Sequence, residues 1–343
     1  MLSLIQKLIK LALILLILLN LLLAFSLSQF LNRPYGQESG KKTIEIEKGQ
    51  GTRIIARHLK KNGLLSNSLF FRLSYSLYYS PRFLMAGEYQ FSLPVSPKKI
   101  ILDLIGGKIM LHPITIPEGL TYEEIASLLI EKQYPIEGSF TEACQQAELV
   151  QAFDPKATNL EGYLYPETYF FGRGAKAQEL VKAMVEQFTR VFGEKERRRA
   201  KELGMSIREV VTLASLIEKE TSRPEEKVLV SAVFHNRLRL GMKLDCDPTI
   251  IYALKLQNRF DGNLRLSDKS LDSPYNTYLY PGLPPGPICN PGKEAIMAAL
   301  YPAPVDFLYF VSRGDGSHTF NRSYNEHLKA VKRFQLKNKG HLR

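Results

Sequence analysis

The sequence predicts an α+β protein in three parts: an N-terminal transmembrane helix, a small α+β module, and a mainly helical α+β domain. An uncharged apolar run predicts the first part, a half-module that occurs twice predicts the second, and apolar residues at a helical period predict the third. The expected boundaries are residues 1–10 for an N-terminal tail, 11–31 for the transmembrane helix, 32–42 for a linker, 43–135 for the module and 136–343 for the last domain.

The apolar run extends from Leu11 to Leu31 without a charge. About 20 such residues, at ~1.5 Å per residue in a helix, cross a hydrocarbon core of ~30 Å. Lys7 and Lys10 stand just before the run, which favours a cytoplasmic N-terminus and an exported remainder. The alternative is a cleaved secretory signal, but no A-x-A cleavage site follows the run. Either interpretation places the rest of the chain outside the cytoplasm.

The composition restricts the class of protein and its partners. With 45% hydrophobic and 23% charged residues, the chain can bury a core, which excludes wholesale disorder. The net charge of +12 favours anionic partners, and export excludes nucleic acid, leaving lipid head groups or an acidic wall polymer. Cys144, Cys246 and Cys289 form no C-x-x-C pair, so they indicate neither a zinc site nor a redox site. The basic tail Lys329 to Arg343 is interpreted as a solvated terminus that could also meet anionic surfaces.

The half-module is visible when the chain is compared with itself at an offset of 70 residues. Each copy predicts a short strand, a glycine turn and an amphipathic helix, with the strands at Thr43 to Lys48 and Ile114 to Glu118. Further segments between them predict a helix at Ser68 to Tyr79, a strand at Ala86 to Phe91 and a helix at Pro97 to Ile105. A strand, two helices and a strand resemble the lysin-motif domains that hold N-acetylglucosamine chains; a packing or spacer domain is the alternative.

Helical periodicity dominates from Glu161 onward. A stripe of apolar residues predicts a helix at Lys176 to Phe192, and a capping box of Ser206 and Glu209 predicts the start of another. The second helix ends in Leu213 to Thr221, which carries Glu218 and Glu220. An acid in apolar surroundings has a raised pKa, as a general acid for glycosidic cleavage requires. Considered alone, the segment also fits a charged helix end on the surface.

Several polar, proline-rich segments follow in the next hundred residues. Neutral hydrogen-bonding and aromatic side chains on loops of fixed shape are typical of a cleft for a sugar polymer. These segments are Asp245 to Thr249, Ser273 to Tyr278, Gly282 to Pro287, and Tyr309 to Phe320. We therefore expect them to lie around one carboxylic acid.

An ordered set of motifs resembles the endolytic murein transglycosylase, or YceG-like, family over nearly the whole chain. The motifs are Ala86-Gly87-Glu88-Tyr89, Leu160-Glu161-Gly162-Tyr163-Leu164-Tyr165-Pro166-Glu167-Thr168-Tyr169, Ala214-Ser215-Leu216-Ile217-Glu218-Lys219-Glu220-Thr221, Val233-Phe234-His235-Asn236-Arg237-Leu238, Asp247-Pro248-Thr249, Tyr275-Asn276-Thr277-Tyr278, Gly282-Leu283-Pro284-Pro285-Gly286-Pro287 and His318-Thr319-Phe320.

The resemblance implies a single-pass inner-membrane enzyme that cleaves nascent glycan strands between N-acetylmuramic acid and N-acetylglucosamine and leaves 1,6-anhydro-muramic ends. It implies one Glu acting as acid and then as base, with no water consumed, no metal and no cofactor. Peptidoglycan strands and the membrane are the expected partners, with peptidoglycan synthesis enzymes as further candidates. A muramidase-type hydrolase and a non-catalytic wall-binding scaffold are the alternative functions.

The resemblance also directs the choice of site residues. Glu220-Thr221 is similar to the Glu-Ser step that ends the catalytic helix of other lytic transglycosylases, so Glu220 is the expected acid. Glu218 would then be its structural companion, bound to Arg237 or to a backbone amide. The expected substrate contacts are Glu161, Asp245, Asp247, Thr249, Tyr275, Asn276, Thr277 and Tyr278. Asp245 and Cys246 depart from the family pattern, which has Gln and then a small hydroxyl residue, so the role of Asp245 stays open.

Overall fold

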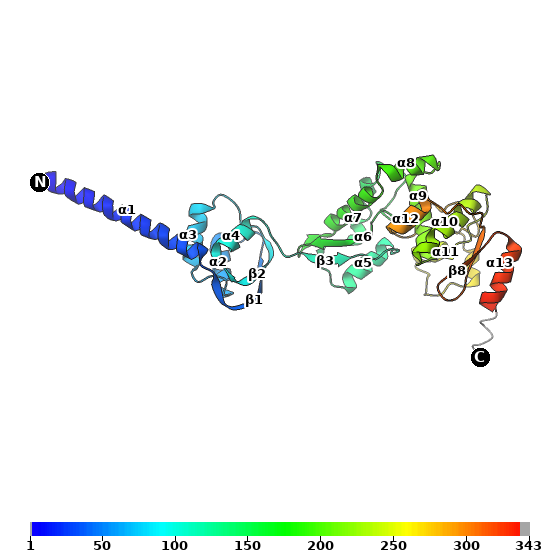
Figure 1. Ribbon diagram of the computed structural model, residues 1–343, viewed down its shortest axis with the longest axis horizontal. Coiled ribbons are helices and arrows are strands. Elements are labelled where there is room, and N and C mark those ends of the chain that lie inside the picture. The colour runs from blue at the N-terminus through cyan, green and yellow to red at the C-terminus, as the bar shows by residue number, and fades with distance from the viewer. Residues whose placement is uncertain (1, 337–343) are drawn as a thin grey trace. The chain divides into compact units, whose positions relative to one another are not determined.

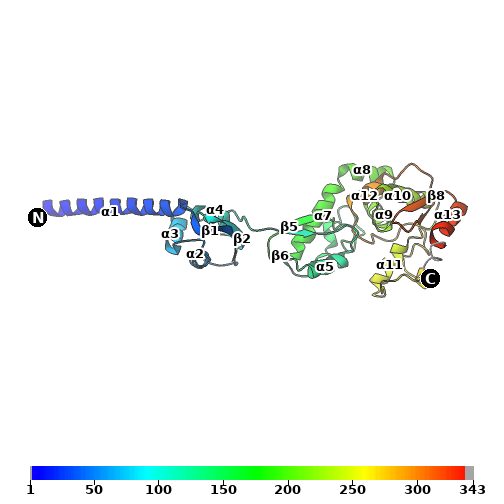
Figure 2. The ribbon, with the colours of Figure 1, turned by 60° about the horizontal axis from the view of Figure 1, so that its bottom comes forward.

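The computed structural model describes residues 2–336, and the end of the basic tail lies outside these residues. The fold is mixed α+β, as predicted, and Figures 1 and 2 show the long N-terminal helix followed by two groups of elements. Contacts divide the chain into two compact units. Unit 1 holds the described residues up to His112 together with Phe170–Gly174, and unit 2 holds Pro113–Tyr169 and the described residues from Ala175 onward.

Unit 1 begins with α1 (Leu2–Asn32), the apolar helix that the sequence predicts. An antiparallel pair of strands, β1 (Tyr35–Ile46) and β2 (Gly87–Val95), encloses two helices in the chain, and a further helix follows the second strand. The three helices are α2 (Thr52–Lys61), α3 (Ser68–Tyr78) and α4 (Pro97–Ile105). Their apolar faces form one core with the inward side chains of both strands, including Ile44, Ile55, Phe71, Tyr89 and Ile100.

The linker expected at residues 32–42 is replaced by regular structure. α1 continues to Asn32, and β1 begins at Tyr35. From Gly40 onward β1 pairs residue by residue with β2, so that Lys42 lies opposite Phe91. The glycines and lysines here have a linker-like composition, but backbone hydrogen bonding to a neighbouring strand does not depend on apolar side chains. The helix therefore enters unit 1 directly.

Unit 2 is mainly helical and contains three short two-stranded sheets. Strands β3 and β5 form one sheet, β4 and β6 form a parallel pair, and β7 and β8 form an antiparallel pair. The strands are β3 (His112–Thr115), β4 (Ile136–Glu137), β5 (Thr168–Phe171), β6 (Ala175–Lys176), β7 (Tyr309–Ser312) and β8 (His318–Asn321). The helices are α5 (Tyr122–Glu131), α6 (Phe140–Ala143), α7 (Ala177–Val191), α8 (Glu194–Glu202), α9 (Ile207–Glu220), α10 (Pro224–Arg239), α11 (Asp247–Leu256), α12 (Lys293–Leu300) and α13 (Tyr324–Val331). Short 3-10 turns lie at Ala147–Leu149 and Leu266–Ser270, and a π-helical turn at Lys332–Leu336 ends the described chain.

The two half-modules have the predicted order of strand, turn and helix, but they belong to different units. The first is β1 and α2 in unit 1, and the second is β3 and α5, which lie almost wholly in unit 2. In the second copy β3 pairs with β5 and α5 contacts α6, so its partners come from the following chain. The boundary between the units therefore lies at His112, whereas the sequence predicted it near residue 135.

Helix α9 is the central element of unit 2. It contacts α8, α10, α11 and α12, and every residue from Val210 to Ile217 is buried. The predicted capping box is present: Glu209 N donates to Ser206 Oγ, and Ser206 N donates to the Glu209 carboxylate. The helix ends at Glu220 because Thr221 is extended. Its last turn, with both candidate acids, is thus fixed from several sides.

Candidate active site

The two carboxylates at the end of α9 have different surroundings. Glu218 accepts an ion-pair hydrogen bond of 2.9 Å from Lys227 Nζ and one of 3.0 Å from the backbone N–H of Gly292. Lys227 is buried in α10, so both Glu218 oxygens are bound inside the protein. The expected backbone amide partner is thus confirmed, whereas the expected partner Arg237 is wrong. Arg237 instead binds Asp245 and backbone carbonyls, because it lies on a later turn of α10.

A third carboxylate, which sequence reasoning missed, joins the same ion pair. Glu118 lies 3.8 Å from Lys227 Nζ, and burial together with the negative charge of Glu218 raises its pKa. The Glu118 carboxylate also lies directly against Gly292, where a Cβ atom would overlap it. A larger residue at position 292 would therefore displace the Glu118 side chain from this cluster. No motif in the sequence indicated that Glu118 and Gly292 lie so close together.

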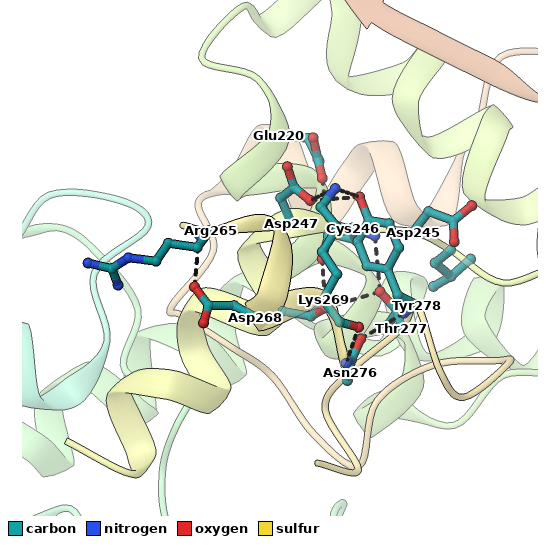
Figure 3. Close-up of polar contacts among 12 residues, drawn as sticks. Glu220, Asp245, Cys246, Asp247, Arg265, Asp268, Lys269, Asn276, Thr277 and Tyr278 are labelled. Atoms are coloured by element: carbon teal, nitrogen blue, oxygen red, sulfur yellow. Dashed lines mark hydrogen bonds and ion pairs between the residues drawn. The ribbon is translucent and has the colours of Figure 1, made fainter. Parts of the chain in front are cut away.

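Glu220 accepts a hydrogen bond from the thiol of Cys246, with 3.0 Å between Oε1 and Sγ (Figure 3). Its side chain is half-buried, and the apolar end of α9 removes water from it. This burial raises its pKa to about 6, the nearby charge of Asp247 acts in the same direction, and the hydrogen bond from Cys246 acts against them. Burial also raises the pKa of the Cys246 thiol, so the thiol keeps the proton that it donates.

Three polar side chains that are partly exposed to solvent, Asp247, Tyr278 and Lys269, lie beside Glu220 (Figure 3). Tyr278 OH donates to Asp247 Oδ1 at 2.6 Å, and Lys269 Nζ lies 3.0 Å from the same oxygen. The ammonium group also lies 4.2 Å from the centre of the Tyr278 ring. Asp247 is half-exposed, so it can form further hydrogen bonds. Sequence reasoning named Asp247 and Tyr278 but missed Lys269, which has no motif of its own.

Three other predicted substrate residues are fully buried and support this group from within. Thr277 Oγ1 accepts from the backbone N–H of Cys246 at 3.0 Å, and Thr249 Oγ1 donates to the carbonyl of Cys246 at 2.7 Å. The Asn276 amide donates to the carbonyls of Lys269 and Leu271 at 3.1 and 2.7 Å. These bonds fix the two loops that carry Cys246, Lys269 and Tyr278. Thr249, Asn276 and Thr277 therefore bind other protein groups, although the sequence predicted that they would contact the substrate.

Glu161 is a correction of the same kind. The structure buries it, and its carboxylate accepts from the backbone N–H of Tyr122, the Asn290 amide and Tyr252 OH at 3.2, 3.0 and 3.4 Å. Burial raises its pKa to about 8. The predicted Tyr275 packs its ring 5.0 Å from that of Tyr252 and is half-buried. Glu161 thus joins the second half-module to α11, and Tyr275 packs against its partner Tyr252.

Asp245 is exposed and has a left-handed backbone with φ of 51°. Its carboxylate lies 2.9 Å from Arg237 Nη1, an ion pair on the opposite side of Cys246 from Asp247. The positive charge of Arg237 lowers the pKa of Glu220, and Asp245 partly neutralises that charge. Asp245 is therefore linked to the candidate acid through Arg237.

His318 also reaches the end of α9, through a residue that sequence reasoning missed. Glu226 accepts from the backbone N–H of His318 at 2.9 Å and from Thr221 Oγ1 at 3.2 Å, and it pairs with His318 Nδ1 at 2.7 Å. Although burial alone raises the pKa of Glu226, its bonds to His318 leave that pKa lowered. This contact holds β8 against the Thr221 turn.

The proline-rich loop at Gly282 to Pro287 does not lie beside Glu220 as expected. Its Pro285 carbonyl accepts from Arg208 Nε at 2.7 Å, at the first turn of α9, which is ~18 Å along the helix from Glu220. A cavity of about 1360 Å³ opens at this end of α9, and neither Glu218 nor Glu220 lines it. Its size alone does not make it the reaction site, because Asp154, the buried carboxylate that lines it, is held by Arg208 Nη1 at 2.6 Å and by Tyr163 OH at 2.5 Å.

The comparisons with known proteins identify the family. The model of the YceG-like family matches residues 44–333. The chain belongs to the YceG-like family. It is 32% identical over 307 residues to the endolytic murein transglycosylase of Bacillus subtilis, covering 85% of this chain and 84% of that protein. It is 29% identical over 301 residues to the endolytic murein transglycosylase of Streptococcus pneumoniae strain D39, covering 79% of this chain and 54% of that longer protein.

A solved structure of a YceG-like protein from Listeria monocytogenes is also similar. It matches with a TM-score of 0.57 and 31% sequence identity, and the match covers 85% of this chain and all of the other. The match to the YceG-like family includes both units, since it begins in β1 and ends within the π-helical turn after α13. All the motifs that suggested the resemblance therefore lie within the part of the chain that matches the YceG-like family.

Proposed function

We propose that this chain is a lytic transglycosylase that cleaves the glycan strands of peptidoglycan, with Glu220 as its single catalytic acid and base. The observation that carries the assignment is the contrast at the end of α9. Glu218 is bound on both oxygens by Lys227 and Gly292, whereas Glu220 is half-buried, has a pKa raised to about 6 and borders the open group of Asp247 and Tyr278. The names of the curated relatives support the same activity.

The chemistry requires only this one carboxyl group. In the first step, protonated Glu220 gives its proton to the glycosidic oxygen as the bond to C1 of the N-acetylmuramic residue breaks. In the second step, the carboxylate takes the proton of the C6 hydroxyl while that oxygen bonds to C1. Glu220 regains its proton, no water is consumed, and the product ends in 1,6-anhydro-muramic acid. A pKa of about 6 suits both halves, because each requires a different protonation state.

The other predicted residues take two roles in this proposal. Asp247 and Tyr278 have open faces beside Glu220 and would contact the glycan, with Lys269 holding them in place. Thr249, Asn276, Thr277 and Glu161 position the loops from inside. Asp245 acts through Arg237, and Tyr275 packs against Tyr252, which hydrogen-bonds to Glu161.

The test uses the full chain and purified glycan strands. Glu220→Gln should abolish the release of anhydro-muropeptides, because an amide cannot donate the proton and recover it. The control is Glu225→Gln, an exposed residue at the start of α10, which should cleave as wild type does. Mass spectrometry decides the reaction type, since a hydrolase would leave products heavier by one water. Full activity in Glu220→Gln would refute the assignment.

We also propose that α1 anchors the enzyme in the bacterial inner membrane as a single span with a cytoplasmic N-terminus. Its 29 residues Leu4–Asn32 have a mean hydropathy of 2.8 in their most apolar window, and Lys7 and Lys10 precede the uncharged part. An externally added protease that removes unit 2 from intact spheroplasts supports this orientation. Protection of unit 2 from that protease would reverse it.

Unit 1 is proposed to be a lysin-motif-like module that holds glycan near the catalytic unit. The order β1, α2, α3, β2, with the two strands antiparallel, supports this proposal. Binding of the Glu220→Gln chain to purified peptidoglycan provides the assay, because the inactive enzyme does not degrade its ligand. The test variants reverse the charge of the exposed Arg53 and Arg57 of α2 and, separately, of exposed residues on α4. If all of these variants still bind peptidoglycan as the parent does, the module is a spacer.

A further inference from the structure

Helix α1 leaves very little space between unit 1 and the membrane. Its side chains are exposed from Leu4 to Phe25, and Leu27 and Leu31 are already buried in the protein. The helix continues without a break to Asn32, so it carries unit 1 on its end as a rigid stem. The uninterrupted exposed part of the helix therefore ends at Phe25.

That lipid-exposed part is short. The uncharged exposed stretch Leu11–Phe25 extends ~22 Å as a helix, whereas the hydrocarbon core is ~30 Å thick. Lys10 and Lys7 can extend the span by reaching to the inner surface with their long side chains. Even then the helix leaves the hydrocarbon near Phe25, and Phe30 lies ~7.5 Å farther along, at the depth of the lipid head groups.

Helix α3 lies at this same depth. The ring of Phe30 meets the ring of Phe70 edge-on, with 5.8 Å between centroids, and α1 contacts both α3 and α4. Figures 1 and 2 both show α3 beside the end of α1 that enters unit 1. The exposed side chains along α3 therefore lie within about one helix length, ~16 Å, of the head-group layer.

The exposed residues of α3 and its following loop suit a membrane surface. We define the α3 face as Leu69, Arg72, Leu77, Tyr78, Arg82 and Phe83, all of which are exposed. Tyr75 OH donates to the carbonyl of Arg82, which folds the loop back onto α3, and Phe83 beside it has 83% of its surface exposed. Aliphatic, aromatic and Arg side chains together are the composition that favours the membrane interface.

The charge of unit 1 matches the same partner. Residues 33–112 contain thirteen Lys and Arg against five Asp and Glu, most of the excess positive charge of the whole chain. Basic residues near an anionic lipid surface are attracted to it electrostatically. Apolar side chains at head-group depth and a basic surface around them complement an anionic bilayer.

We propose that the α3 face lies in the outer head-group layer of the membrane and binds anionic phospholipid. The contact rests on the proposed anchor, since it is α1 that holds unit 1 at this depth. It gives the enzyme two membrane attachments: the span itself and an interfacial surface that fixes the rotation of unit 1 about the helix. One face of unit 1 is thereby turned away from the wall, and the opposite side is left open to glycan.

The absence of tryptophan from the sequence provides a clean probe. Phe83→Trp in the full chain places a single indole on the α3 face, and Leu266→Trp in unit 2 is the matched control because Leu266 is 84% exposed against 83% for Phe83. Both variants are reconstituted into vesicles of phosphatidylglycerol and phosphatidylcholine, some of which carry lipids brominated near the head group. Floating the vesicles on a density gradient first measures anchoring itself.

The proposal predicts that brominated lipid quenches the indole fluorescence of the Phe83→Trp variant at least about twofold more than that of the control, with emission shifted to the blue. The difference should shrink in vesicles of phosphatidylcholine alone and in the Arg72→Gln, Arg82→Gln background. Equal quenching of both variants in vesicles that float with the protein overturns the α3 contact and leaves the anchor intact. Protein that stays at the bottom of the gradient overturns the anchor, and the α3 contact with it.

Discussion

Cys246 Sγ lies 3.0 Å from Glu220 Oε1, so the thiol donates a hydrogen bond to the carboxylate proposed as the acid. The thiol comes from the residue before α11, and its backbone is held by Thr249 and Thr277. Because Cys246 remains protonated, it favours the charged form of Glu220 and opposes the effect of burial. In the pKa of about 6, burial is the largest raising cause and the Cys246 hydrogen bond is the largest lowering cause.

Removing this donor should change both the rate and its pH dependence. Cys246→Ala raises the pKa of Glu220 because the bond that stabilises the carboxylate is lost, so the fall of activity with rising pH moves to higher pH. We also expect kcat to fall roughly tenfold or more, since a hydrogen bond to a charged group contributes about 1.5–3 kcal/mol. Cys246→Ser keeps a donor and should retain the wild-type profile. Superimposable pH profiles of the alanine and wild-type enzymes would contradict this role.

Asp247 should act on the same pKa in the opposite direction. Its negative charge raises the pKa of Glu220, so Asp247→Asn lowers that pKa and leaves less protonated acid at pH 7. We expect kcat/KM at pH 7 to fall severalfold, with a smaller loss at pH 5 where Glu220 is protonated in both enzymes. Glu225→Gln provides the control for a surface carboxylate near the end of α9. An equal loss at both pH values would mean that Asp247 only binds substrate.

The buried pair of Lys227 and Glu218 should dominate the stability of the α9 end. Lys227→Met leaves the carboxylates of Glu118 and Glu218 close together without their cation, and removing one partner of a buried pair costs about 3–5 kcal/mol. Lys255→Met breaks the more exposed pair with Glu124 and should cost at most about 1 kcal/mol. Urea unfolding of both variants measures the difference, and equal losses would show that the Lys227 cluster is no stronger than a surface pair.

Glu161 should make stability depend on pH. Its pKa is raised from 4.5 to about 8, so the folded state binds the proton more tightly than the unfolded chain. The free energy of unfolding therefore falls as pH rises from about 4.5 and becomes level above about 8. Glu161→Gln can keep the bonds to Tyr122 and Tyr252 and should remove this slope, with Tm near wild type at pH 5 and several degrees higher at pH 8. The same pH slope in both proteins would refute a buried proton on Glu161.

Local patterns in the sequence predicted most of the elements. The predicted capping box of Ser206 with Glu209 forms, because a cap and its helix lie within four residues of each other. The apolar run of α1 and the stripe of α7 likewise depend only on spacing along the chain. The ordered motifs predicted the family, because motifs are compared along the sequence and the comparison does not require the tertiary contacts.

The sequence by itself determined the mixed fold class, the apolar N-terminal helix, the family and the helix end that carries two carboxylates. The tertiary structure decided how those two differ. α9 is buried on all sides from Val210 to Ile217, so no apolar stripe marks an inner face that could separate Glu218 from Glu220. The difference comes from Lys227 on α10 and Cys246 before α11, and only the folding of three segments together brings those groups to the end of α9.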